Sequence, residues 1–271
     1  MADTPEAAAV RGLGLVGRLL LVALALGTAG AGVWVLRDAI APASSTAAPE
    51  IPAEQVAAAP VQPGSVIPAG TEASLPQGTA AGTDPLRAWA ERTAGPTGVP
   101  ARALQAYGNA ELVLRSTDPA CRVSWATLAG IGRVESNHGQ YGGAVLGADG
   151  WPSKPIIGVP LDGSAGVRSI PDTDHGDLDG DPDVDRAAGP LQFIPSTWRK
   201  WVSDGNLDGR GDPQQIDDAA LAAARYLCAG NRNLTTAQGW WAAVLSYNNS
   251  TPYAQKVFGL ADSYARAAAA R

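Results

Sequence analysis

The feature that most constrains how this chain folds is a run of eighteen residues without a charge, 19–36, bracketed by Arg18 and Arg37. At 1.5 Å per residue, an α-helix of this length is about 27 Å long, just enough to cross the hydrocarbon core of a bilayer. Arg11 and Arg18 precede the run, so the positive-inside rule keeps residues 1–18 in the cytoplasm. The run is predicted to be a single-pass membrane anchor.

A cleaved signal peptide is the alternative for the same segment. Residues 29–31 and 41–43 resemble the small-residue sites at which signal peptides are cut. In that case the mature protein is secreted rather than held at the cell membrane. Both interpretations place the remainder of the chain outside the cytoplasm.

Residues 37–83 are predicted to be a disordered linker. Seven of the 43 residues from Ala41 to Thr83 are Pro, none is Lys or Arg, and no apolar period is present. Such a composition favours an extended chain without a core of its own. At about 3.1 Å per residue, it would carry a following domain up to roughly 130 Å from the membrane.

Residues 84–271 are predicted to form one mainly α-helical domain. Leu104, Tyr107, Glu111 and Leu114 recur at helical spacing, and no stretch of five residues alternates between apolar and polar, so any sheet is small. The capping pattern predicts where the helices begin. These starts are Asp84-Pro85, Pro100, Ser124, Asp212-Pro213, Thr235 or Thr236, and Thr251-Pro252.

A long insertion interrupts this helical pattern. Eleven glycines and nine aspartates lie between residues 139 and 189. The composition predicts an irregular segment or a small hairpin, and loops of this length in compact domains are usually functional.

The charge and the cysteine count exclude some classes of partner. A net charge of −6 argues against binding to nucleic acid. Two Cys and two His cannot form a structural zinc site from thiolates alone. Export places Cys121 and Cys228 in an oxidising compartment, so a disulfide between them is predicted, with two buried free thiols as the alternative. Nothing in the sequence indicates an oligomeric state.

Glu135 combines two features that raise the pKa of a carboxyl group. It lies on the apolar side of the helix that begins after Ser124, and it lies near the end of that helix, where a negative charge opposes the helix dipole. A carboxylic acid that stays protonated near neutral pH is what a glycosidase uses as its general acid. The alternative is a surface glutamate that pairs with Arg133.

Three motifs follow one another along the chain. They are Glu135-Ser136, then Gly189-Pro190-Leu191-Gln192-Phe193-Ile194-Pro195-Ser196-Thr197-Trp198, then Tyr247-Asn248. On these motifs, the chain between Ser124 and Tyr264 resembles the lytic transglycosylases of bacterial peptidoglycan, and most an actinobacterial form of the membrane-bound lytic murein transglycosylase B branch. Leu191 stands where the family usually has Met, a nearly isosteric exchange.

The resemblance implies a lysozyme-like fold that binds peptidoglycan glycan strands and uses no cofactor for its chemistry. Glu135 would protonate the oxygen between N-acetylmuramic acid and N-acetylglucosamine, and the sugar's own 6-hydroxyl would close a 1,6-anhydro ring. Gln192 and Phe193 would line a cleft, and Asn248 would support the substrate acetamide or Glu135. The substrate-binding residues implied are Ser136, Gln192, Phe193, Tyr247 and Asn248.

Two other functions stay open at this stage. The first is a hydrolase on the same fold, in which a second carboxylate about 6.5–9.5 Å from Glu135 activates water. The Asp-rich insertion would supply that group. The second is a non-catalytic module that binds the cell wall, in which Glu135 is structural.

The segment from residue 204 to residue 212 resembles the first part of an EF-hand loop. Oxygen-bearing side chains stand at positions 1, 3, 5 and 9, with Gly209 at position 6, but Gln215 replaces the usual Glu at position 12. The pattern predicts a weak structural Ca²⁺ site, with a solvated turn whose last Asp caps the next helix as the alternative. The predicted ligands are Asp204, Asn206, Asp208 and Asp212.

Seven aspartates alternate through residues 172–185. The carboxylates of such a run repel one another unless cations or sugars bind them. A solvated loop, a second Ca²⁺ site, or the second carboxylate of a hydrolase are the interpretations. His138 and His175 are predicted to be loop residues without a catalytic role.

Overall fold

The structure, a computed structural model, describes residues 84–164 and 167–270. The predicted N-terminal segment 1–18, membrane anchor 19–36 and linker 37–83 lie outside the described residues. Within the described ranges, no helix has the length and apolar character needed to cross a bilayer.

The described chain is mainly α-helical, as predicted, and its strands form one small hairpin. In chain order, its elements are α2 (Pro85–Thr97), α3 (Ala101–Thr117), α4 (Trp125–Ser136), the 3₁₀ turn η2 (Tyr141–Gly143), β1 (Ile157–Pro160), β2 (Arg186–Ala188), α5 (Pro195–Trp201), α6 (Ile216–Cys228), α7 (Ala237–Tyr247) and α8 (Thr251–Ala269).

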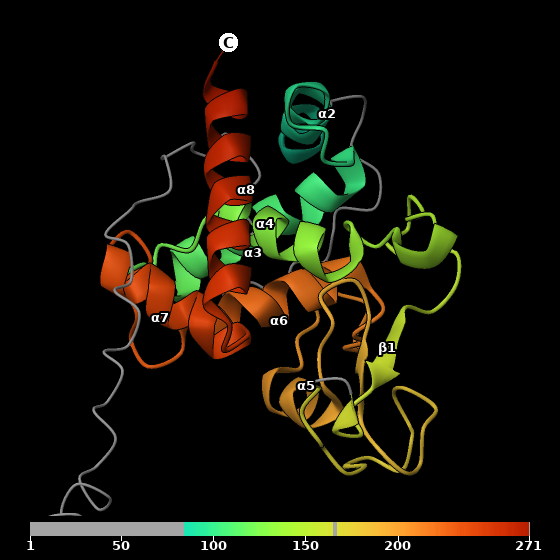
Figure 1. Cartoon of the computed structure of the whole chain (residues 1–271). Helices are drawn as coiled ribbons and strands as arrows, with labels where there is room; N and C mark the ends of the chain where they lie inside the picture. Colours follow the sequence, from blue (N-terminus) through green and yellow to red (C-terminus); the bar gives the residue numbers. More distant parts are fainter. Residues whose placement is uncertain (1–83, 165–166, 271) are drawn as a thin grey trace, which may run out of the picture. The chain divides into compact units, whose positions relative to one another are not determined.

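Helix α4 lies at the centre of this arrangement, in contact with α3, α6 and α8 (Figure 1). Every residue from Trp125 to Gly132 is buried. A helix that is apolar on all sides has no solvent face, so neighbours must cover it completely. Only its last turn, which carries Glu135, reaches partly exposed positions.

Two glycines let the neighbours of α4 approach its backbone. A Cβ at Gly130 would lie 2.8 Å from the carbonyl oxygen of Val257 in α8. A Cβ at Gly132 would lie 2.1 Å from the hydroxyl of Tyr107 in α3. A side chain at Gly130 would therefore push α8 away, and one at Gly132 would displace the Tyr107 ring.

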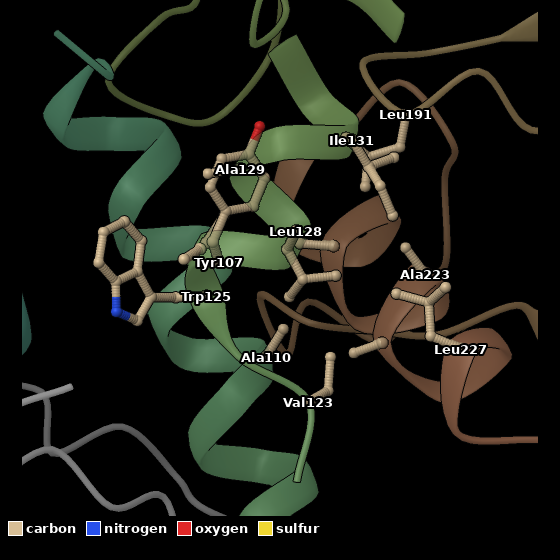
Figure 2. Packing of buried hydrophobic residues seen from close by; sticks show 14 of the residues in the cluster. Tyr107, Ala110, Val123, Trp125, Leu128, Ala129, Ile131, Leu191, Ala223 and Leu227 are labelled. Carbon is tan, nitrogen blue, oxygen red and sulfur yellow. The ribbon is translucent and has the colours of Figure 1, made fainter. Parts of the chain in front are cut away.

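Helices α3 and α6 pack through small side chains. In α6, Ala219, Ala220, Ala222, Ala223 and Ala224 are fully buried. Figure 2 shows Leu128 and Ile131 of α4 in one cluster with Leu191, Ala223 and Leu227, so the core joins α4, α6 and the loop after β2. Alanine also has the highest helix propensity, so the same residues favour the helix and its close packing.

The helix starts confirm most of the capping predictions. The side chains of Asp84, Ser124 and Thr236 accept hydrogen bonds from backbone amides of the first turns they precede. The cap of α8 is Ser250 rather than Thr251, since the Ser250 hydroxyl accepts from the amide of Tyr253.

The predicted start of α6 at Asp212-Pro213 is wrong by one turn. Gln215 is the N-cap, and its side-chain oxygen accepts from the amides of Asp217 and Asp218. Asp212 instead closes a turn ahead of the helix by accepting from the amide of Gln214. A buried amide side chain has taken the capping role that the sequence pattern assigned to an aspartate.

The Gly/Asp-rich insertion contains the small hairpin that was one of its two predicted forms. Strands β1 and β2 pair antiparallel, with an irregularity between Ile157 and Pro160. In Figure 1 the hairpin, α5 and the loops of the insertion lie together beside α6. The strand β2 runs directly into residues 189–193, so the hairpin positions that loop.

The predicted disulfide is confirmed. Cys121 and Cys228 are bonded, with a sequence separation of 107 residues. The bond joins the segment before α4 to the end of α6. Both sulfur-bearing residues are buried, at 1% and 4% exposure.

We expect reduction of this disulfide to lower the free energy of unfolding by about 4 kcal/mol, because opening a loop of this length restores entropy to the unfolded chain. Thermal melts with and without reductant measure the effect. The double variant Cys121→Ser with Cys228→Ser should match the reduced wild type and should not respond to reductant. A reductant effect that persists in the variant would contradict the assignment.

Candidate active site

Glu135 lies in the last turn of α4 and is only partly buried. The hydroxyl of Tyr253, from the first turn of α8, donates a hydrogen bond of 2.5 Å to its Oε1. Burial raises the pKa of the Glu135 carboxyl to about 7, and the Tyr253 hydrogen bond opposes that rise. Near neutral pH, this side chain is present in both protonation states.

This outcome confirms the predicted direction of the pKa and, of the two predicted causes, the apolar surroundings rather than the helix dipole. The main cause is desolvation, and the second influence is Tyr253. Arg133, the partner in the alternative interpretation, is exposed. Among the described residues, Tyr253 is the hydrogen-bond partner of Glu135.

Ser136 fastens the end of α4 to the loop that follows β2. It is 1% exposed, its hydroxyl donates to the carbonyl of Pro190 at 2.5 Å, and it accepts from the amide of Gly139. Protein neighbours thus use the Ser136 hydroxyl, and direct contact of Ser136 with substrate stays a prediction. Its role is to hold Glu135 and the loop together.

The loop from residue 189 to residue 192 is a tight turn closed by paired bonds between Ala188 and Phe193. Gly189 has φ +81°, and a Cβ there would lie 1.7 Å from the carbonyl oxygen of Pro213, so only glycine fits. Gln192 also has a positive φ of 50°, and its side chain donates to the Gly189 carbonyl at 2.9 Å. Gln192 is partly buried, which leaves part of its amide accessible.

Phe193 and Tyr247 form the support beneath this loop. The two rings lie 5.9 Å apart in a T-shaped contact, and Phe193 makes a second such contact with Trp198. Tyr247 donates from its hydroxyl to the Leu191 carbonyl at 2.6 Å. Phe193 is 2% exposed, so the expectation that it lines a cleft is corrected to a supporting position inside the core.

Asn248 ends α7 as its C-cap and is exposed. Among the predicted substrate-binding residues it presents the most open side chain. Tyr247 before it is partly buried, and proximity to Glu135 is the second cause, after desolvation, that raises the pKa of its hydroxyl. The motif therefore brings a partly buried aromatic ring close to Glu135 and is followed by an exposed amide at the end of α7.

Sequence reasoning missed Tyr253 as a functional residue. Its spacing with Val257 and Leu260 indicates an apolar helix face, and that face does pack against α4. Its hydroxyl nevertheless reaches Glu135, and both desolvation and the Glu135 charge raise the pKa of Tyr253. The signal that could have identified it is a tyrosine rather than a phenylalanine on a buried face, because a buried hydroxyl needs a partner.

Glu111 is a second buried glutamate, at 7% exposure, and burial raises its pKa as well. Its Oε2 accepts from the amide of Trp125, the first residue of α4, and its Oε1 pairs with Arg115. Both oxygens are occupied by donors of the protein. This carboxylate is a structural anchor for the start of α4.

In the predicted calcium loop, aspartate carboxylates accept hydrogen bonds from backbone amides of the loop. Asp204 accepts from the amides of Asp208 and Gly209, and Asp218 accepts from the amides of Gly205 and Asp212. Among the described residues, the carboxylates of this loop do not form a group of three within ligand distance of one another. Calcium binding by Asp204, Asn206, Asp208 and Asp212 stays a prediction.

The two histidines have different positions. His138 is 2% exposed, and its Nδ1 lies 3.2 Å from the Tyr107 hydroxyl. Burial lowers its pKa to about 3, so it is neutral and unsuited to proton transfer near neutral pH. His175 has an exposed side chain in the insertion. Both histidines therefore lie in loops, as predicted.

A pocket of about 540 Å³ lies at the C-terminal ends of α3 and α6, with Leu114, Trp201 and Arg225 in its wall. None of the residues predicted for catalysis or substrate binding lines it. The pocket is therefore separate from the surface around Glu135.

A scan against models of known protein families and a search of curated proteins find no match for this chain. Among solved structures, the chain is similar to the Escherichia coli lytic transglycosylase Slt35 in complex with bulgecin A and to the same protein in complex with calcium. Each match has 16% identity and a TM-score of 0.37, and covers 67% of this chain. The shares of the Slt35 chains covered are 79% and 80%.

We expect Tyr253→Phe to raise the pKa of Glu135 above its value of about 7, because the variant removes the donor that favours the carboxylate. A pH titration of the glutamate side-chain carbons by NMR measures the change. Tyr141→Phe, which alters an exposed tyrosine, is the matched control and should leave the titration unchanged. If the pKa of Glu135 stays equal or falls in Tyr253→Phe, the Tyr253 hydrogen bond does not lower that pKa.

We also expect the Glu135 side chain to lower the free energy of unfolding at high pH, where it is ionised. Its folded pKa of about 7 lies above the usual value of 4.5, so its favourable contribution is complete below pH 4.5 and is lost as the pH rises through 7. Glu135→Gln should therefore gain stability relative to wild type at pH 8, by up to about 3 kcal/mol, and gain less at pH 5. Thermal melts at both pH values measure this, with the exposed Glu91→Gln as control. An equal effect of Glu135→Gln at pH 5 and pH 8 would contradict it.

Proposed function

We propose that this chain is a peptidoglycan lytic transglycosylase. It cleaves the β-1,4 bond between N-acetylmuramic acid and N-acetylglucosamine, forms a 1,6-anhydro end, and serves cell-wall turnover. The observation that carries the proposal is the Glu135 carboxyl, whose pKa of about 7 lets it give and then take a proton at neutral pH. The motifs of residues 189–198 and 247–248 support the same family.

In the first step, the protonated Glu135 donates its proton to the glycosidic oxygen as the bond from that oxygen to the muramic acid C1 breaks. The sugar C1 then carries developing positive charge, and Glu135 is left as a carboxylate. Tyr253 donates a hydrogen bond to this carboxylate, so it stabilises the charge that forms on Glu135 during the step.

In the second step, the Glu135 carboxylate accepts the proton of the substrate's 6-hydroxyl as that oxygen bonds to C1. The net change is a proton moved from O6 to the leaving oxygen, with one bond broken and one formed. No water is consumed. Proton transfer through Glu135 is sufficient for both steps, so the reaction needs no cofactor.

The surroundings of Glu135 favour the transglycosylase over the hydrolase. Desolvation and the Tyr253 hydrogen bond are the influences on its pKa, and no second carboxylate among the described residues is one of them. A carboxylate placed to activate water would raise the pKa of its neighbour by repulsion. A lone acid is instead suited to a nucleophile that the substrate itself supplies.

The neighbouring amides have roles in binding the sugar. We infer that the exposed Asn248 side chain bonds the acetamide of the reactive sugar, and that Gln192 contacts the sugar from the loop that Ser136 ties to α4. Because Tyr247 and Phe193 support that loop from below, their effect on substrate is through the positions of Gln192 and Glu135.

The proposed location is the outer side of the cell membrane. The predicted anchor 19–36 would hold the domain there, and the linker 37–83 would let it reach the wall; cleavage after the apolar run would release it to the wall instead. The disulfide between Cys121 and Cys228 supports export, because disulfides persist in oxidising compartments.

We expect the wild-type protein to release muropeptides with 1,6-anhydro ends from purified peptidoglycan, and Glu135→Gln to do so at least about a hundredfold more slowly. Liquid chromatography with mass spectrometry identifies the products, which lack the water of a reducing end. The wild-type rate should fall as pH rises above about 7, where Glu135 loses its proton.

Glu111→Gln is the matched control, since it changes the other buried glutamate with a raised pKa. It should lower the melting temperature and leave the rate per folded molecule near wild type. Reducing ends in place of anhydro ends would identify a hydrolase. Equal digestion by wild type and Glu135→Gln, or binding of peptidoglycan without digestion, would identify a module in which Glu135 is structural.

A further inference from the structure

The insertion brings three carboxylates together near its base. Asp172, Asp174 and Asp185 each offer one oxygen, and these three oxygens all lie within 4.8 Å of one another. Asp174 is 7% exposed and Asp185 is fully buried. Three acids at this separation repel one another strongly once they are removed from water.

The protein supplies little positive charge to this cluster. Among the described residues, no salt bridge involves Asp174 or Asp185, and Asp172 has only the exposed His175, at 3.7 Å. Two arginines beside this segment have other partners: Arg199 donates to the carbonyl of Thr173, and Arg186 pairs with Asp181. Asp185 accepts from the amide and hydroxyl of Thr173, which are neutral donors.

One oxygen of the cluster lacks a partner altogether. Asp174 Oδ1 is buried, and among the described residues it has no hydrogen-bond partner, while Oδ2 accepts from the amide of Leu178. A buried carboxylate oxygen without a donor costs free energy, and native structures leave few of them. Desolvation and the charges of Asp179, Asp185 and Asp172 raise the pKa of Asp174.

We propose that Asp172, Asp174 and Asp185 bind a Ca²⁺ ion. Ligands of Ca²⁺ lie about 2.3–2.6 Å from the ion, so oxygens of one coordination sphere are separated by up to about 5 Å, which agrees with the 4.8 Å limit here. All donors are carboxylate oxygens on an irregular loop, a combination that suits Ca²⁺ better than the rigid octahedral sphere of Mg²⁺.

The ion would join the two ends of the Asp-rich segment. Asp172 and Asp174 stand at its beginning, and Asp185 directly precedes β2. Strand β2 leads into the turn at Gly189, whose neighbour Pro190 accepts the Ser136 hydrogen bond. Calcium at this place would therefore stabilise the path from the insertion to the end of α4, whatever reaction Glu135 performs.

This site is distinct from the loop of residues 204–212, where the sequence alone predicts calcium. In that loop, Asp204 accepts two backbone amides and the Asp208 oxygens accept the Arg210 amide and the Asn206 side chain. Neither Asp204 nor Asp208 belongs to the group of three oxygens in the insertion. Variants in one loop and in the other therefore show which of the two sites binds an ion.

The test is calorimetric titration of CaCl₂ into the purified full-length chain after treatment with EDTA. Asp174→Asn should bind one Ca²⁺ ion per chain fewer than wild type. Asp177→Asn removes the same charge from an exposed position of the same segment and should bind as wild type does. Asp208→Asn in the other loop should leave the Asp174-dependent ion in place.

Melting curves check that the variants fold. In EDTA, Asp174→Asn should be at least as stable as wild type, since it removes one of three crowded negative charges. Ca²⁺ at about a hundred times the dissociation constant should raise the wild-type melting temperature by about 5–10 °C, and this part of the rise should be missing in Asp174→Asn. Full calcium binding by Asp174→Asn, no binding by wild type, or a calcium effect abolished only by Asp208→Asn would overturn the proposal.

Discussion

The crossing of α4 and α8 at Gly130 is the contact on which the other features depend. There the backbones meet without a side chain between them, since a Cβ would lie 2.8 Å from the Val257 carbonyl oxygen. On the opposite side of α4, Gly132 leaves room for the hydroxyl of Tyr107 in α3 because it has no side chain. Residues two apart on a helix point about 200° away from each other, so α4 is held between α8 and α3 with its rotation fixed. The direction of the Glu135 side chain follows from that rotation.

The same crossing explains why Glu135 meets Tyr253. Tyr253 stands one turn before Val257 on α8, and Glu135 stands just over one turn after Gly130 on α4, so the second contact follows from the first in helices that run in opposite directions. The distance from the Tyr253 hydroxyl to the carboxylate is set by helix packing rather than by a loop. A group that must give and accept a proton thus has its hydrogen-bond donor on a rigid element.

Sequence patterns predicted the features that depend on periodicity and local capping. The buried face of α3 and the cap at Ser124 are of this kind. The bond between Cys121 and Cys228 was predicted on other grounds, because the chain has only two cysteines and both follow a predicted export signal. The patterns missed features that depend on which atom of a side chain meets which partner. Phe193 stands in a motif associated with a cleft but packs in the core, and Tyr253 serves both the apolar face of α8 and a carboxylate. Spacing along one helix carries no information about the hydroxyl at the end of a ring.

The buried carboxylates differ in what compensates their charge. Glu111 has the guanidinium of Arg115 and a backbone amide, whereas among the described residues Asp172, Asp174 and Asp185 form no salt bridge with an arginine or lysine. Among the described residues, Glu135 has one neutral donor, the Tyr253 hydroxyl, and near pH 7 a bound proton neutralises its charge in about half of the molecules. The guanidinium that compensates Glu111 belongs to Arg115 and cannot be transferred to a substrate. The metal ion proposed at Asp174 would stabilise the loop and would not be transferred either. A proton can be transferred to a leaving oxygen, so among these carboxyl groups Glu135 is the one suited to acid catalysis.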